Sequence, residues 1–153
     1  MKKLSPQIAE TRARWLAQTA SACLVDEARL SPKPGLVDSR GNGAHQDLNL
    51  ALMERSARSL QPTFHALAQQ SWRRPADIAL RETVGRLGRE GEAQMMQATS
   101  GVNTHRGAIW ALGLLVSATA MLGGESHAQK ITETAAALAR LPVSYTHLRA
   151  HET

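Results

Sequence analysis

Apolar residues recur along this chain at the three- and four-residue spacing of helices. Between residues 8 and 30 the apolar positions include Trp15, Leu16 and Leu24, and Pro32 ends the pattern. Similar patterns predict helices, in chain order, over residues 8–30, from near 47 to 60, 62–72, from 75 to about 99, 107–124 and 128–141. No stretch shows the strict alternation of a strand. The chain is therefore predicted to be all-α, a multi-helix bundle.

The predicted helix over residues 107–124 carries no charged residue. Its length touches the lower limit for a membrane span. However, glycine, serine and threonine fill many of its positions, and no aromatic belt flanks it. We therefore expect a central helix buried on all sides, and no membrane partner.

Composition agrees with one helical domain. Hydrophobic residues make up 42% of the 153 residues and aromatic residues only 3%, so the core must be built from aliphatic side chains. Cys23 is the only cysteine, which excludes an internal disulfide and favours a reducing, cytoplasmic location. The basic N-terminus is not followed by an apolar run, so no secretory signal is predicted.

The net charge of +5 and the pI of about 10.1 raise the possibility of nucleic-acid binding. Basic residues alternate with acids, as in Arg81–Glu82 and Arg89–Glu90, and form no dense stripe. Few aromatic residues remain for stacking on bases. An anionic small molecule, rich in phosphate, is the favoured ligand, and no nucleic acid is expected.

A long polar loop, LSPKPGLVDSRGNGAHQD, joins the first two predicted helices at residues 30–47. Loops of this length inside compact domains are usually functional or disordered, and the fixed geometry of two prolines argues against disorder. Lys33 and Arg40 supply positive charge, and the backbone around three glycines can form an anion-binding nest. Asp38, His45 and Asp47 can titrate or bind a hard cation such as Mg²⁺. A structural interpretation stays open, with Asp47 as a helix cap and Asp38 as a turn former.

A second polar turn, SGVNTHRG, directly precedes the uncharged helix. Asn103 or Thr104 can cap that helix, but a cap explains one residue and not the run from Asn103 to Arg106. Glu92 lies about two turns earlier on the preceding helix and is expected to face partly inward. A glutamate in that place is costly unless it meets a cation or a donor.

The segments SPKPGLVDSRGNGAHQDLNL and EAQMMQATSGVNTHRGAIWALGLL together resemble the triphosphoribosyl-dephospho-coenzyme A synthase family. The resemblance spans about residues 15–124. RGNGAHQD and HRGAIWALGLLVSA are similar to the malonate decarboxylase branch rather than the citrate lyase branch. Members of this family are roughly twice as long, so the resemblance implies that the chain is part of a larger helical domain.

The resemblance implies a glycosyl transfer. ATP and 3′-dephospho-CoA give 2′-(5″-triphosphoribosyl)-3′-dephospho-CoA and free adenine, as the ribose 2′-hydroxyl of dephospho-CoA attacks C1′ of ATP. The product is the precursor of the prosthetic group on the acyl carrier protein subunit of the decarboxylase.

That chemistry needs an acid and a base beside the reacting carbon and positive groups on the phosphates. The predicted catalytic residues, between which the acid and base roles stay open, are Asp38, His45, Asp47, Glu92 and His105. The predicted substrate-binding residues are Lys33, Gly35, Arg40, Asn42, Gly43, Asn103, Thr104 and Arg106. Mg²⁺ is expected on Asp38, Asp47 or Glu92. The Walker pattern of many ATP sites is absent.

Two other classes stay open. One is a Mg²⁺-dependent helical protein that binds or hydrolyses nucleotides without transfer. The other is a basic helical interaction or nucleic-acid module in which the loops are structural.

The last segment, PVSYTHLRAHET at residues 142–153, abandons the helical pattern. It resembles a translated sequencing-adapter read-through, so it is predicted to be non-native, with residues 1–141 as the N-terminal part of one synthase domain. A natural disordered tail is the alternative. His147 and His151 are therefore excluded from the candidate site.

Overall fold

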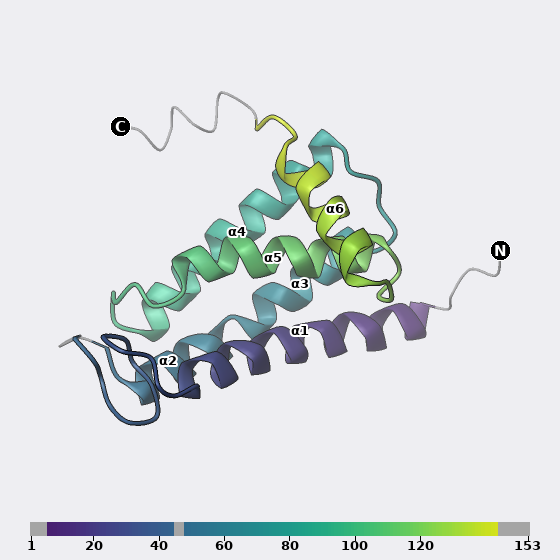
Figure 1. Cartoon of the computed structure of the whole chain (residues 1–153). Coiled ribbons are helices and arrows are strands. Elements are labelled where there is room, and N and C mark those ends of the chain that lie inside the picture. The colour runs from purple at the N-terminus through teal and green to yellow at the C-terminus, as the bar shows by residue number, and fades with distance from the viewer. Residues whose placement is uncertain (1–5, 45–47, 144–153) are drawn as a thin grey trace, which may run out of the picture.

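The computed structural model describes residues 6–44 and 48–143 (Figure 1). Its helices are α1 (Pro6–Arg29), α2 (Leu50–Ser59), α3 (Gln61–Ser71), α4 (Ile78–Ala98), α5 (Arg106–Met121) and α6 (Ala128–Ala139). Over these residues there is no strand, only an isolated bridge between Asp38 and Gly41. The all-α prediction is confirmed.

Two helix starts show how capping sets the boundaries. Asp77 caps α4, because its Oδ1 accepts the N–H of Leu80 at 2.8 Å. Asn49 caps α2 in the same way, through the N–H of Leu52 at 2.8 Å. The expectation that this helix begins near Asp47 is therefore wrong by about one turn, since the nearer polar residue Asn49 is the cap.

Helix α3 is the centre of the bundle. It packs against α1 on one side and against α5 and α4 on the other, as Figure 1 shows. Phe64, Leu67 and Ala68 of α3 are almost completely buried. Helix α6 covers part of α5, and α2 continues the line of α3 along α1.

Helix α5 is not buried on all sides, and that expectation is wrong. Its side chains Trp110, Ala111 and Leu115 are exposed, Trp110 with a relative exposure of 42%. Helices α3, α6, α4 and α1 pack against α5 and leave the face with these side chains uncovered by the described part of the chain. Among the described helices, none combines the length and the apolar character of a membrane span.

Helices α3 and α4 meet at a close contact between Thr63 and Gly91. A Cβ atom added at Gly91 would lie 2.5 Å from Cγ2 and 2.6 Å from Oγ1 of Thr63, which is buried. Both distances are shorter than the contacts that Cβ atoms make in protein structures. The glycine is therefore required by packing and not by its backbone angles.

Replacing Gly91 by alanine is expected to lower the free energy of unfolding by about 1–3 kcal/mol, because the two helices must move apart. Gly88→Ala is the matched control on the same helix. Nothing lies within 4 Å of its added Cβ, so it should raise stability by up to about 1 kcal/mol through helix propensity. Urea unfolding followed by circular dichroism measures both. Equal effects of the two substitutions would contradict the packing argument.

Candidate active site at the two-loop end of the bundle

The two polar loops lie at the same end of the bundle (Figure 1). The first loop leaves the C-terminus of α1 and leads to α2, and the second joins α4 to α5. Side-chain contacts between α2 and the second loop tie this end together, as described below. The fold thus brings together two segments that are about sixty residues apart in sequence.

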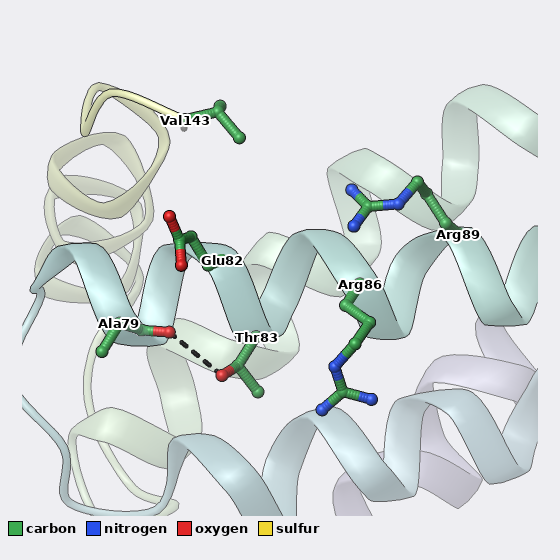
Figure 2. A pocket seen from close by; sticks show the side chains of 6 residues that line it. All are labelled: Ala79, Glu82, Thr83, Arg86, Arg89 and Val143. Carbon is green, nitrogen blue, oxygen red and sulfur yellow. Dashed lines mark hydrogen bonds between the residues drawn. The ribbon is translucent and has the colours of Figure 1, made fainter. Parts of the chain in front are cut away.

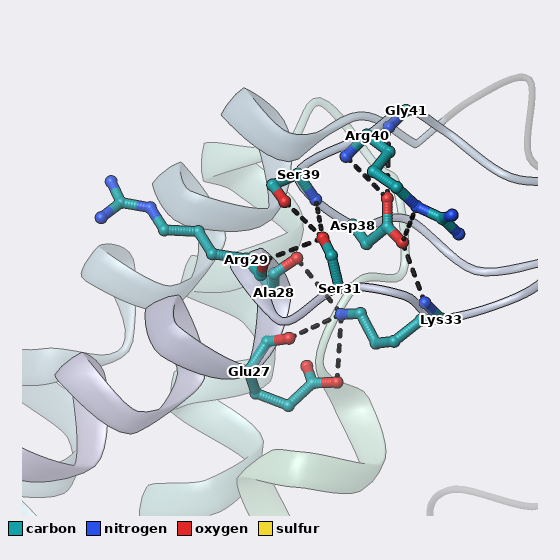
Figure 3. Close-up of polar contacts among 9 residues, drawn as sticks. All are labelled: Glu27, Ala28, Arg29, Ser31, Lys33, Asp38, Ser39, Arg40 and Gly41. Carbon is teal, nitrogen blue, oxygen red and sulfur yellow. Dashed lines mark hydrogen bonds and ion pairs between the residues drawn. The ribbon is translucent and has the colours of Figure 1, made fainter.

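Asp38 holds the first loop in shape (Figure 3). Its carboxylate accepts the backbone N–H groups of Lys33 at 2.9 Å, Arg40 at 2.7 Å and Gly41 at 3.3 Å, and it pairs with Arg40 Nε at 3.3 Å. These bonds, above all the one from the Lys33 N–H, hold the pKa of Asp38 below its usual value. Asp38 is thus an ionised turn former, with both oxygens engaged in its own loop.

Lys33 closes the C-terminus of α1. Its Nζ lies 2.6 Å from the carbonyl oxygen of Glu27, 3.2 Å from that of Ala28 and 3.3 Å from the Glu27 carboxylate (Figure 3). An ammonium group has three protons, and these contacts use all of them. A cation at a helix C-terminus is also favourable for the helix dipole. Binding of phosphate by Lys33 stays a prediction, and it requires the release of these contacts.

The glycines of the first loop let its backbone fold back on itself. Gly43 has φ +59°, and a Cβ there would lie 2.5 Å from the carbonyl carbon of Gly35. Ala44 N donates to Gly35 O at 3.1 Å beside this contact. The loop encloses a shallow hollow of about 250 Å³, lined by Lys33, Asp38, Arg40 and the three glycines among others. Arg40 and Asn42 are exposed at this loop.

The second loop begins where α4 ends. Ser100 and Gly101 have φ of +56° and +89°, and Gly101 N donates to Met96 O at 2.7 Å. Asn103 then accepts the N–H of Arg106, the first residue of α5, through Oδ1 at 3.3 Å. The N-cap position itself is His105, whose side chain makes no capping bond with the described residues, so neither Asn103 nor Thr104 is the N-cap residue that the sequence predicted. Thr104 faces inward instead.

Thr104 and His105 meet Ser56 of α2 in a buried polar chain. His105 Nδ1 lies 2.7 Å from Ser56 Oγ, Ser56 Oγ contacts Thr104 Oγ1, and Thr104 Oγ1 lies 2.9 Å from the Met95 sulfur. His105 has a relative exposure of only 5%. Its Nε2 is buried and has no hydrogen-bond partner among the described residues.

The sulfur of Met95 determines which group is the donor in each of these hydrogen bonds. A thioether has no proton to donate, so Thr104 donates to Met95. Ser56 then donates to Thr104, and His105 Nδ1–H donates to Ser56. In a neutral imidazole with its proton on Nδ1, Nε2 is a free acceptor. The arrangement therefore leaves the acceptor Nε2 of a neutral imidazole without a hydrogen-bond donor in the described part of the chain.

Burial also keeps His105 neutral. It lowers the pKa of His105 from the usual 6.5, and the negative charge of Glu27 opposes this only in part. The native state therefore disfavours the protonated imidazole more strongly than the unfolded chain does.

This shift predicts a pH-dependent stability. Above pH 6.5 the histidine is neutral in both states, and its full contribution is present. As the pH falls below 6.5, His105 is protonated in the unfolded chain but stays neutral in the native state. The free energy of unfolding therefore decreases until the pH passes below the native pKa. Urea unfolding at a series of pH values measures this slope. His105→Asn should flatten it, and an unchanged slope in that variant would contradict the assignment.

Glu92 and Arg106 pair across α4 and the start of α5. The distance from Arg106 Nε to Glu92 Oε1 is 2.7 Å, and both side chains are partly exposed. Glu92 thus meets a cation, the guanidinium of Arg106, while its predicted catalytic or metal-binding role stays a prediction. The pair joins a predicted catalytic or metal-binding residue to a predicted substrate-binding residue.

A family model described as ATP:dephospho-CoA triphosphoribosyl transferase matches residues 13–147. The chain belongs to this family. The resemblance carried by the two loop motifs is thereby confirmed.

Curated relatives of this transferase family agree. The chain is 87% identical over 142 residues to the 2-(5''-triphosphoribosyl)-3'-dephosphocoenzyme-A synthase of Klebsiella pneumoniae, covering 93% of this chain and 51% of the relative. It is 59% identical over 143 residues to a probable synthase of the same name from Stutzerimonas stutzeri, covering 92% and 49%. A probable synthase from Azotobacter vinelandii is 56% identical over 138 residues, covering 89% and 46%. The chain therefore spans about half the length of the curated relatives it matches. No solved structure matches it.

The transferase family raises the question of a metal ion. In the described parts of the chain, no three His, Cys, Asp or Glu side chains gather closely enough to hold one. Asp38 uses its oxygens within its loop, and Glu92 pairs with Arg106. His45 and Asp47 lie outside the described residues. The carboxylates that are described do not fit a Mg²⁺ site as they lie, so Mg²⁺ stays a prediction and no step below is derived through it.

Ser56 and Met95 belong to the site, although the sequence did not predict them. Ser56 is a buried serine in the middle of α2, and Met95 belongs to the apolar face of α4. Both look like core positions in a hydrophobic pattern. Only the packing of α2 against the second loop shows that they orient His105.

Proposed function

We propose that this chain is part of an enzyme that transfers the triphosphoribosyl group of ATP to the 2′-hydroxyl of 3′-dephospho-CoA and releases adenine. The observation that carries this proposal is the 87% identity to the Klebsiella pneumoniae synthase over 142 residues. The free, buried Nε2 of His105 supplies a chemical group that such a reaction needs.

In this proposal His105 is the general base, and binding of the substrate must open a path to its Nε2, which is buried in this structure. The attacking 2′-hydroxyl must lose its proton as the new bond to C1′ forms, and a neutral imidazole nitrogen accepts it. Ser56 is a positioning residue, because it holds Nδ1–H and so leaves Nε2 free. Adenine leaves from the opposite face of the carbon, through a transition state with oxocarbenium character by analogy with glycosidases.

The cationic side chains at this end are proposed to bind phosphate. Arg106 directly follows His105 in sequence, and Arg40 extends from the rim of the first loop. Guanidinium groups suit phosphate because they donate two parallel hydrogen bonds. Asp38 acts indirectly here, since its hydrogen bonds fix the backbone from Lys33 to Gly41.

Finer features of the function are proposed on sequence grounds. The segments RGNGAHQD and HRGAIWALGLLVSA support a product destined for the acyl carrier protein of a malonate decarboxylase. A cytoplasmic location is supported by the single cysteine, Cys23, which forms no disulfide within the chain.

The experiment that tests the proposal measures adenine release from ATP by chromatography. It uses the chain extended by the part of its Klebsiella relative that it does not cover. Adenine should appear only when 3′-dephospho-CoA is present, and an acceptor with hydrogen in place of the 2′-hydroxyl should give none. Release of ADP without adenine would favour a nucleotide hydrolase and contradict the proposal.

A further inference from the structure

A cationic groove runs between α4 and α5, beside the Glu92–Arg106 pair. Its volume is about 260 Å³, and its lining includes Arg81, Gly85, Arg89, Glu92, Arg106 and Trp110. The groove thus carries three guanidinium groups and one carboxylate.

Arg81 is a buried cation of this groove whose charge is not compensated by a carboxylate of the described residues. Its relative exposure is only 9%, and its Nε is buried without a hydrogen-bond partner in the described chain. Its guanidinium lies 4.6 Å from the centre of the Trp110 ring, a cation–π contact that uses only its face. No carboxylate of the described residues pairs with it. A buried charge in this state is costly unless something else compensates it.

Arg89 brings a second unpaired cation to the same place. A Cβ at Gly85 would lie 3.1 Å from Arg81 Nη1 and 3.3 Å from Arg89 Nη1, so both guanidinium groups converge over this glycine. Burial, and then the charge of Arg89, lower the pKa of Arg81. Two like charges that face one small residue repel each other, and an anion between them removes that repulsion.

The carboxylate in the groove does not supply this anion. Glu92 Oε1 lies 2.7 Å from Arg106 Nε and is thereby neutralised. The charges of Arg81 and Arg89 remain. A phosphate fits them by charge and by its ability to accept paired N–H bonds.

We propose that the α4–α5 groove binds a phosphate group of a substrate, with Arg81 and Arg89 as its ligands. The proposal deepens the transferase function, and it rests on that function for the source of the phosphate, the triphosphate of ATP or the pyrophosphate of dephospho-CoA. Arg106 lines the groove and directly follows His105 in the chain, so the groove lies next to the segment that carries the proposed base.

The test is calorimetric titration of the full chain with inorganic tripolyphosphate. Arg89→Gln and Arg81→Gln should each weaken binding at least tenfold. Arg86→Gln is the matched control, because it removes the same charge from the same helix. Arg86 pairs with Glu90 at 3.0 Å and does not line the α4–α5 groove. It lines, together with Arg89, the neighbouring pocket drawn in Figure 2, where its guanidinium points away from that of Arg89. It should change affinity less than twofold.

Thermal unfolding separates a ligand role from a structural role for Arg81. If Arg81 is held for an anion, Arg81→Gln removes an uncompensated charge, and the melting temperature should stay equal or rise. Should this variant fail to fold, Arg89→Gln still tests the groove, since Arg89 is exposed. Equal affinity of the wild type and Arg89→Gln, or no binding of tripolyphosphate by the wild type, would overturn the proposal.

Competition identifies the source of the phosphate. Displacement of tripolyphosphate by ATP but not by dephospho-CoA assigns the groove to the triphosphate, and the reverse assigns it to the pyrophosphate. Displacement by neither contradicts a substrate site. Binding is measured without turnover in this chain. An arginine-dependent site together with no adenine release from the chain extended to the length of its relatives would therefore refute the transferase function and leave the groove standing.

Discussion

Replacing His105 by asparagine is expected to lower the rate of adenine release about 10²–10⁴-fold, the range for loss of a general base. The asparagine amide can still donate to Ser56 as Nδ1–H does, so the buried chain to Met95 is kept. What is lost is Nε2, the unpaired acceptor. Chromatography of adenine measures the rate, in the chain extended to the length of its relatives.

Two further variants test whether the loss of rate is specific to His105. His65→Asn is the matched control, since His65 lies on α3 and contacts Glu10 at 2.8 Å, away from both loops. It should leave the rate unchanged. Ser56→Ala should lower the rate less than His105→Asn and should alter its pH profile, because Nδ1–H loses its acceptor. A rate for His105→Asn within threefold of wild type would remove His105 from the chemistry.

Gly43→Ala is expected to lower the free energy of unfolding by about 2 kcal/mol or more. The added Cβ would lie 2.5–2.6 Å from backbone atoms of Gly35 and Leu36, which cannot rotate away as a side chain can. The φ of +59° adds strain for any residue with a Cβ. Urea unfolding of the chain measures the effect.

Gly41→Ala is the control for the same loop. Nothing lies within 4 Å of its added Cβ, and it has no positive φ, so it should change stability by less than about 0.5 kcal/mol. If Gly43→Ala lowers the free energy of unfolding no more than Gly41→Ala does, the close backbone contact at Gly43 does not stabilise the first loop. If instead it spares stability and weakens ATP binding, the close approach at Gly43 serves a ligand, in line with the predicted substrate-binding role of Gly43.

The helical pattern predicted the fold class and most of the helices because each helix carries its own signals. Pro62 lies in the first turn of α3, in agreement with the predicted range 62–72. Helix α4 begins at Ile78, three residues after the predicted start at 75, because Asp77 is its cap. The pattern failed where a boundary depends on competition between neighbours, as with Asn49 and Asp47. It also failed for α5, because a lack of charge shows that a helix is apolar but not how many neighbours cover it.

The site was predictable only in part. The structure places the two predicted polar loops at one end of the bundle, and Glu92 meets the cation Arg106. The binding and catalytic roles predicted for these loops stay predictions. The contacts that Lys33 makes with the end of α1 could not be predicted from the sequence, because they depend on the path of the loop. Arg81 was visible as a basic residue, but its burial against Trp110 depends on how α4 and α5 pack. The roles of His45 and Asp47 and the non-native character of residues 142–153 stay predictions.

The most direct test of the central claim follows both ends of ATP in one reaction. ATP labelled in the γ-phosphate and, separately, in the adenine ring is incubated with 3′-dephospho-CoA and the chain extended to the length of its relatives. The transferase account predicts that the γ-phosphate label moves into the dephospho-CoA product with the triphosphate intact, while the ring label appears as free adenine. Ring label found in ADP, with the γ-phosphate label released as inorganic phosphate or transferred alone to dephospho-CoA, would contradict it.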